Sequence, residues 1–331
     1  MIVDLPDTNT SKVSKALVKI REEGGAVALG RVLTLVIRTA LGQEEDAIEA
    51  ANDASREHPM RVIVVSTDAD DGVKSGRGAR LDAQIRVGGD AGASEVILLK
   101  AYGAAASDEE GLVTGLLLPD APVVVWWPGD APESPSTSDL GRIAQRRITD
   151  SSNSSNPNET LRRLSSNYSP GDTDFAWTRL TLWRAQLAAV LDQPPFEPVE
   201  AIEVSGASDS PSTLLLAAWL RHQLKVTVDY GISSRANGSS GIHGVKLSRS
   251  SGVIELERSV PNVATLVQPD QPLHDLALPR RSLRDCLAEE LRRLDPDDLY
   301  GEVLTQGVLE LGEPEPDPES ASAPQTTTEV R

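Results

Sequence analysis

The sequence predicts an α/β protein with two domains and an acidic tail. Strand and helix patterns alternate in the first half, which is typical of a three-layer-like α/β domain with a mixed, partly parallel sheet. The second half mixes helices and strands without that alternation, which favours an α+β domain. We expect an N-terminal domain over 1–165, a C-terminal domain over 166–311, and a disordered, Pro-rich acidic tail over 312–331.

The first half begins with a helix pattern and continues as strand, helix and strand. Val13, Ala16, Leu17 and Ile20 recur at helical spacing. The apolar runs at 31–37 and 61–66 are rich in β-branched residues and predict buried strands. An alanine-rich helix pattern at 44–57 lies between them, which predicts a βαβ unit with parallel strands.

Four further elements are expected before the domain break. Residues 81–87 alternate strictly between apolar and polar side chains, which predicts a half-exposed strand. Residues 96–99 fit either a strand or the start of a helix. A helix is expected over 111–118, and the run at 121–127 predicts a buried strand that stops at Pro128.

The second half contains helix patterns that alternate with no regular set of strands. Helices are expected over 158–167, 174–191, 212–224 and 282–294, followed by a short helix after 295–298. Ser282 and Asp285 have the spacing of a capping box. Strands are expected over 199–205, 226–230, 244–248 and 253–258, and the last two predict a hairpin.

Charge and cysteine content exclude several classes of protein. With 32 Lys and Arg against 50 Asp and Glu, the net charge is −18, so phosphate-rich surfaces of nucleic acids and anionic membranes would repel the chain. The single cysteine, Cys286, excludes an internal disulfide and a Cys-based zinc site. We find no export signal and no run long enough to span a bilayer, and expect a cytoplasmic protein.

Motifs for catalysis or cofactor binding are missing from the sequence. There is no phosphate-binding loop, and the glycine-rich segments at 76–78 and 88–92 match no complete dinucleotide fingerprint. The four histidines are widely spaced, and no serine lies in a nucleophile elbow. We therefore expect no catalytic residue, no metal and no cofactor, and we interpret Cys286 as a buried core residue.

Two polar clusters are candidates for a site or for a structural network. The first contains Arg142, Arg146, Arg147 and Asp150, and the second contains Asp172, Asp174 and Arg179, with Arg184 following. Paired arginines could hold a phosphate or carboxylate through bidentate hydrogen bonds. The favoured alternative is an Arg–Asp network that ties the two halves together, with Asp172 or Asp174 capping a helix.

Three tryptophans are candidate contact anchors. Trp126 and Trp127 are adjacent at the end of a predicted strand, so one should face inward and the other outward. The outward one is either covered by another element or free to anchor a partner. Trp177 is the third candidate.

Several long motifs resemble the OpcA family of glucose-6-phosphate dehydrogenase assembly proteins, in its actinobacterial branch. The resemblance extends from about Thr10 to Val308. The motifs lie at 30–36, 116–129, 144–150, 170–174 and 177–184.

The resemblance implies a non-catalytic protein that binds glucose-6-phosphate dehydrogenase and promotes its active oligomer, supporting NADPH production in the oxidative pentose phosphate pathway. It implies no catalytic residues. The alternative from the residues is an enzyme or effector sensor that binds a sugar phosphate, or NADP, near Arg146, Arg147 and the 172–179 segment. A scaffold without effect on activity is a third hypothesis.

Overall fold

The computed structural model describes residues 1–24, 30–67, 78–88, 95–207, 209–233 and 241–311. These residues form two compact units, each assembled from separate stretches of chain. The predicted tail at 312–331, and most of the glycine-rich segments at 76–78 and 88–92, lie outside the described residues. The first unit contains Met1–Ser155, Ser166–Thr178 and Arg281–Gly301; the second contains Asn156–Ser165, Arg179–Arg280 and the described residues from Glu302 onward.

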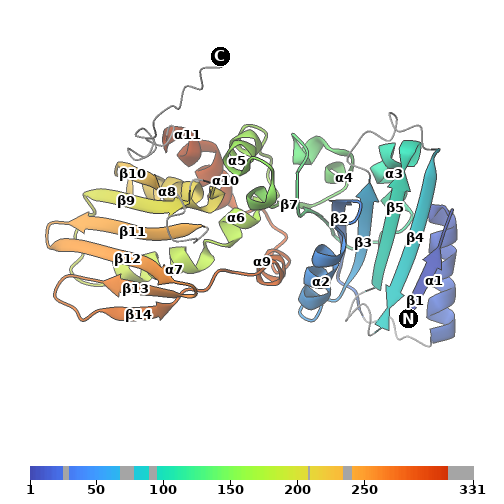
Figure 1. Cartoon of the computed structure of the whole chain (residues 1–331), viewed down its shortest axis with the longest axis horizontal. Coiled ribbons are helices and arrows are strands. Elements are labelled where there is room, and N and C mark those ends of the chain that lie inside the picture. The colour runs from blue at the N-terminus through green and yellow to red at the C-terminus, as the bar shows by residue number, and fades with distance from the viewer. Residues whose placement is uncertain (25–29, 68–77, 89–94, 208, 234–240, 312–331) are drawn as a thin grey trace, which may run out of the picture. The chain divides into compact units, whose positions relative to one another are not determined.

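Eight strands of the described chain form a mixed sheet in the first unit, in the order β1-β4-β5-β3-β2-β6-β7-β8 (Figure 1). From β5 through β3, β2, β6 and β7 to β8, each strand is parallel to the next, whereas β4 is antiparallel to both β1 and β5. The predicted mixed, partly parallel sheet is confirmed. The bounds are β1 Ile2–Leu5, β2 Leu33–Ala40, β3 Met60–Thr67, β4 Arg80–Val87, β5 Glu95–Tyr102, β6 Val123–Trp127, β7 Arg146–Thr149 and β8 Asp172–Asp174.

Short helices connect these strands. The predicted βαβ unit is confirmed, because α2 joins the parallel strands β2 and β3. The segment that fitted either strand or helix is strand β5. The helices and single turns of this unit are α1 Thr10–Gly24, α2 Glu45–Ala54, η2 Gly103–Ser107, α3 Glu109–Thr114, η3 Pro135–Thr137, α4 Asp139–Arg142, η4 Ser151–Asn153, α6 Phe175–Thr178 and α9 Leu283–Glu290.

The central strands send alternate side chains into two hydrophobic cores on opposite faces of the sheet. Leu35 and Ile37 belong to one core, and Val36 belongs to the other. Trp126 and Trp127 divide between the cores in the same way, and only 0% and 3% of their surfaces are exposed. Both faces of β6 are therefore covered, so neither tryptophan is free to anchor a partner.

Helix α9 lies late in the sequence but belongs to the first unit. It packs against α2, and Cys286 and Leu287 join the same core as Leu35. Cys286 is fully buried, which confirms its interpretation as a core residue. The compact units consequently differ from contiguous domains divided at residue 165, because the apolar face of α9 completes a core that the N-terminal half leaves open.

The second unit contains a sheet in which six described strands have the order β10-β9-β11-β12-β13-β14 (Figure 1). Only the β9–β10 pair among these strands is parallel, and the predicted hairpin of β11 and β12 is confirmed. The strands are β9 Ala201–Ala207, β10 Val228–Ser233, β11 Ile242–Arg249, β12 Gly252–Val260, β13 Val263–Val267 and β14 His274–Ala277. The helical segments are α5 Pro157–Ser166, α7 Thr181–Leu191, α8 Pro211–Leu224, α10 Asp298–Glu302 at the unit boundary, η5 Val303–Gly307 and α11 Val308–Leu311.

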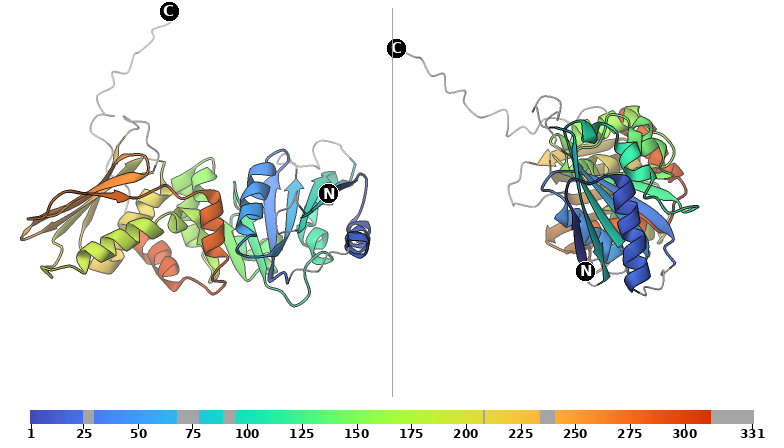
Figure 2. Two further views of the ribbon diagram at one scale, coloured as in Figure 1. Left: turned by 90° about the horizontal axis from the view of Figure 1, so that it is seen from below. Right: turned by 90° about the vertical axis from the view of Figure 1, so that its right-hand side faces the viewer.

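Helices cover one face of this second sheet (Figure 2). Helix α8 packs on β9 and β10. The side chains of Ile202 and Val204 on β9 are buried, and Glu203 between them is exposed. Near α7, the Arg258 guanidinium of β12 lies 5.1 Å from the centre of the Trp183 ring. The sheet therefore has an apolar face toward the helices and a polar face directed away from them.

Several expected elements differ from the structure. Five strands are not predicted by the sequence pattern: β1, β7, β8, β13 and β14. Strands β7 and β8 are short and polar, and so lack the apolar pattern of a buried strand. The helix expected over 111–118 ends at Thr114. The helix expected over 174–191 is two helices, α6 and α7, because the chain passes between the two units after Thr178.

The capping box at α9 gives a test of this part of the fold. The Ser282 hydroxyl accepts a hydrogen bond from the Asp285 backbone N–H at 3.2 Å, and the Asp285 carboxylate accepts one from the Ser282 N–H at 3.3 Å. We expect Ser282→Ala to lower the free energy of unfolding by about 1 kcal/mol, because an N–H at the helix start loses its acceptor. Urea denaturation measures the change, and Ser282→Thr, which keeps the hydroxyl, should remain close to the wild type.

Candidate functional site

Two neighbouring strands of the first unit hold most of the predicted site residues. Arg146 and Arg147 lie on β7, and Asp172 and Asp174 lie on β8. Arg147 is directly opposite Asp172 in the ladder. All four side chains are buried, which for charged residues requires partners inside the protein.

The Arg147 guanidinium is bonded at all three of its nitrogens. Its Nε donates to Oδ1 of Asp172 in a short ion pair. Its Nη1 donates to the Ala144 carbonyl at 3.0 Å, and its Nη2 donates to the Pro170 carbonyl at 2.6 Å. The remaining Asp172 oxygen accepts the Ser169 backbone N–H at 2.8 Å. Arg147 therefore holds the loop before β8 against β7.

Gly171 makes room for this arrangement. Its φ is +96°, a backbone conformation that residues other than glycine rarely adopt. A Cβ at this position would lie 2.6 Å from the Gln145 carbonyl oxygen and 3.0 Å from Nη2 of Arg147. The glycine allows the loop to approach β7 closely enough for the Arg147–Asp172 pair to form.

Arg146 bonds to Glu290, a residue outside the two predicted polar clusters. Its Nη2 donates to Oε2 of Glu290 on α9 at 2.6 Å, and its Nη1 donates to the Asp295 carbonyl at 2.8 Å. The other Glu290 oxygen accepts the Thr178 hydroxyl at 2.6 Å. Glu290 lies three residues after Leu287 and four before Leu294, so a carboxylate on the apolar face of that helix was the available signal.

Asp174 organises the end of β8 and the start of α6. Its carboxylate accepts hydrogen bonds from the Thr149 hydroxyl at 2.6 Å, from the backbone and hydroxyl of Ser151 at 3.0 and 2.8 Å, and from the Ala176 backbone at 2.8 Å. The last bond caps α6. Asp150 is also buried and accepts a hydrogen bond from Asn153 at 3.1 Å.

The arginine–carboxylate network, defined as Arg146, Arg147, Asp172, Asp174 and Glu290, lies within the first unit. It ties residues from both predicted domains into that one unit. Arg179 and Arg184, predicted to belong to the same cluster, fall in the second unit. The structure therefore supports the structural interpretation of Arg146, Arg147, Asp172 and Asp174 and separates them from the other two arginines.

Trp177 is a core residue of the same region. Its indole Nε1 donates to Oδ2 of Asp297 at 2.9 Å, and its ring lies 5.7 Å from the ring of Tyr300. Only 1% of its surface is exposed. All three candidate anchors, Trp177, Trp126 and Trp127, are covered by their own chain, which fits the alternative that the outward tryptophan of the adjacent pair is covered by another element.

Burial controls the ionisation of two groups in this region. It raises the pKa of the Asp172 carboxyl above its ordinary value, and the Arg147 guanidinium offsets part of that rise. It raises the pKa of the fully buried Tyr300 hydroxyl well above 10, and the Asp174 and Asp172 carboxylates add to this rise. Tyr300 is therefore neutral at physiological pH.

These contacts have a chemical consequence for ligand binding. Both arginines of β7 donate to carboxylates and carbonyls of the protein, so a phosphate would have to displace those internal acceptors. Among the described residues, no group of three or more His, Cys, Asp or Glu is placed to hold a metal ion. Nor does the described part of the chain contain a helix with the length and apolar character to cross a bilayer.

Two family models match the chain one after the other. The model described as the glucose-6-phosphate dehydrogenase subunit N-terminal domain, of the OpcA assembly family, matches residues 51–166. The model described as the corresponding C-terminal domain matches residues 170–304. Together they include every residue of the arginine–carboxylate network.

Individual relatives are more distant. A Nostoc punctiforme protein named as an OxPP cycle protein, OpcA, is 26% identical over 231 residues, which are 67% of this chain and 49% of that protein. The chain thus spans about half the length of this curated relative.

The similar solved structures are weaker matches. They include an oxidoreductase from Sinorhizobium meliloti (11% identity, 82% of this chain and 86% of that one, TM-score 0.44). A myo-inositol dehydrogenase from Lactobacillus casei is another, with 10% sequence identity, coverage of 84% of this chain and 93% of that chain, and a TM-score of 0.42.

Removing one partner of the Arg147–Asp172 pair tests its structural role. We expect Arg147→Ala to lower the free energy of unfolding by about 3–5 kcal/mol, because Asp172 would stay buried without its guanidinium. Urea denaturation followed by circular dichroism measures the loss. The exposed Arg56–Asp53 pair provides the control, and Arg56→Ala should change stability by less than about 0.5 kcal/mol.

The same variant should show an altered pH dependence. A carboxyl with a higher pKa in the folded chain than in the unfolded chain binds more protons when folded, so its contribution to stability falls as pH rises. Without Arg147, the Asp172 pKa rises further. The stability deficit of Arg147→Ala should therefore shrink as pH is lowered from about 7 toward about 4. Unfolding curves across that range would contradict this if the deficit stayed constant or grew.

Proposed function

Because this chain belongs to the OpcA family of glucose-6-phosphate dehydrogenase subunits, we propose that it binds that dehydrogenase and promotes its active oligomer. The consecutive matches to both domain models, over residues 51–166 and 170–304, are the observation that carries the proposal. The partner comes from the family description, and the effect on the oligomer is our inference.

The proposed mechanism is differential affinity. A protein that binds two assembly forms of an enzyme equally well cannot shift the balance between them. This chain must therefore bind the active form more tightly than the inactive form. A difference of about 1–3 kcal/mol in binding free energy would change the ratio of the two forms about 5–150-fold.

The proposed role is non-catalytic. The polar cluster with the strongest case for a site, the arginine–carboxylate network, has its guanidinium groups engaged by Glu290, Asp172 and backbone carbonyls. Such a network fixes a fold rather than presenting groups to a substrate. We also propose that the chain acts in the cytoplasm, where it supports NADPH production by the oxidative pentose phosphate pathway.

The test is the activity and oligomer size of glucose-6-phosphate dehydrogenase from the same organism, with and without the full chain. We expect co-elution, a larger share of the active oligomer and higher turnover, because selective binding shifts the assembly equilibrium. Co-elution with unchanged turnover would support a scaffold instead, and absence of co-elution would contradict the proposal.

Two controls separate the remaining alternatives in that experiment. Turnover of glucose 6-phosphate by the purified chain alone would identify an enzyme. A rise in its melting temperature with glucose 6-phosphate, 6-phosphogluconate, NADP or NADPH would identify a metabolite-binding sensor.

A further inference from the structure

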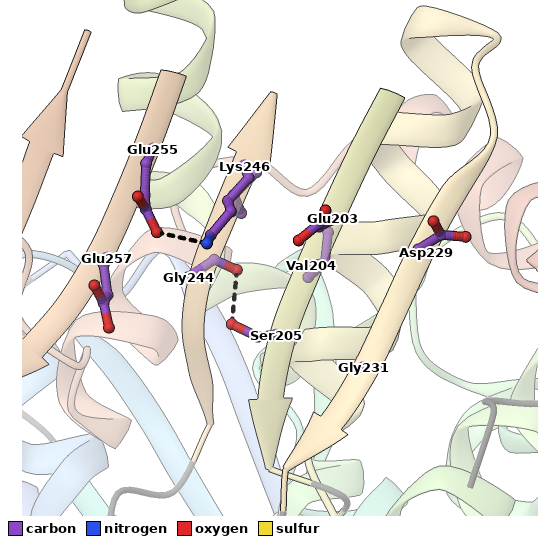
Figure 3. Close-up of a pocket in the computed structure, with 10 residues that line it drawn as sticks. Glu203, Val204, Ser205, Asp229, Gly231, Gly244, Lys246, Glu255 and Glu257 are labelled. Carbon is purple, nitrogen blue, oxygen red and sulfur yellow. Dashed lines mark hydrogen bonds and ion pairs between the residues drawn. The ribbon is translucent and has the colours of Figure 1, made fainter. Parts of the chain in front are cut away.

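The second sheet has one face that no described helix covers. Along β9, β11 and β12 the apolar side chains, such as Val204, Leu247 and Leu256, are buried toward the helices. The intervening side chains, including Glu203, Lys246 and Glu257, point to the opposite face. Figure 3 shows that face, with α8 behind the strands.

Carboxylates form rows across this face. Asp229 lies opposite Glu203, Glu203 lies opposite Lys246, and Lys246 lies opposite Glu255. Lys246 forms an ion pair with Glu255 at 3.1 Å, whereas Glu203 and Asp229 are two acidic residues directly opposite one another on neighbouring strands. Like charges directly opposite one another destabilise a sheet. Their presence indicates a surface whose charge serves binding rather than folding.

A second row extends the negative surface. Glu257 lies opposite both Gly244 and Thr265, and Thr265 lies opposite Asp275. We call the surface formed by Glu203, Asp229, Glu255, Glu257 and Asp275, with Lys246 among them, the acidic sheet face.

The acidic sheet face is hollowed. A cavity of about 440 Å³ lies over it, and Gly231 and Gly244 form part of its floor (Figure 3). Because glycine has no side chain, the strands leave a depression between the carboxylates of Glu203, Asp229 and Glu257. A protruding side chain from another molecule could enter there.

Apolar residues border the same face. Val267 lies opposite Glu255, and Val253 lies two residues before Glu255 on β12, so both point to this side of the sheet. They are 40% and 47% exposed. Apolar side chains beside charged ones are typical of protein interfaces, where burial adds to electrostatic attraction.

We propose that the acidic sheet face is the surface on which this chain docks a Lys- and Arg-rich surface of glucose-6-phosphate dehydrogenase. The inference rests on the proposed function and adds the place of contact. Negative charge at the hollow attracts ammonium and guanidinium groups and repels phosphate, which disfavours a sugar phosphate or NADP there. A second copy of the same face would bring carboxylates against carboxylates.

The experiment compares two double variants with the same change in net charge. Glu203→Lys with Glu257→Lys reverses charge on the acidic sheet face. Glu49→Lys with Glu133→Lys reverses two exposed carboxylates on other elements, α2 and the loop after β6. Binding to glucose-6-phosphate dehydrogenase is measured by surface plasmon resonance at low and high NaCl, and folding by circular dichroism and melting temperature.

We expect the wild type and the Glu49/Glu133 variant to bind alike, with association slowing as salt rises. The Glu203/Glu257 variant should bind at least about tenfold more weakly, mainly through slower association, and should lose most of that salt dependence. Glu203→Gln with Glu257→Gln removes the two charges without adding positive ones, and should show an intermediate loss of binding. This variant still tests the surface if the charge-reversed variant misfolds.

The outcomes separate the two proposals. If the wild type binds and the sheet-face variants bind equally well, the docking surface is wrong and the proposed function stands. If both charge-reversal variants lose binding equally, overall charge rather than this face is responsible, and the inference is again overturned. If the wild type does not bind the dehydrogenase, both proposals fail.

Discussion

The buried charges of β7 constrain the whole first unit. A guanidinium inside a protein is costly unless a carboxylate and further acceptors surround it. Arg147 meets this requirement through Asp172 and two carbonyls, and Arg146 meets it through Glu290 and the Asp295 carbonyl. Since the two carboxylates lie on β8 and α9, pairing the two adjacent arginines brings three distant stretches of sequence together.

This constraint explains why the compact units do not follow the order of the chain. The core of the first sheet needs the apolar face of α9, and the arginine–carboxylate network needs Glu290 on that helix. Hydrophobic burial and charge pairing therefore favour the same placement of α9. The network also favours one packing position of α9 over others, because an alternative packing of the helix would leave Arg146 without its carboxylate.

The two sheets differ in where their charged side chains lie. The first sheet is covered on both faces, and its buried charges are paired internally. The second is covered on one face, and the other bears carboxylates whose charge Lys246 compensates only in part. This partly compensated acidic face is the surface that we propose for docking.

The sequence alone determined the βαβ unit, the strands with β-branched apolar runs, the α9 capping box and the burial of Cys286, because these depend on local patterns of side chains. It also selected Arg146, Arg147, Asp172 and Asp174 as a group. Tertiary structure decided that Arg179 and Arg184 lie in the other unit, that Glu290 completes the network, and that Trp126, Trp127 and Trp177 are covered. Polar strands such as β7 and β8 escaped prediction because their stability comes from partners 23 or more positions away, which no local pattern records.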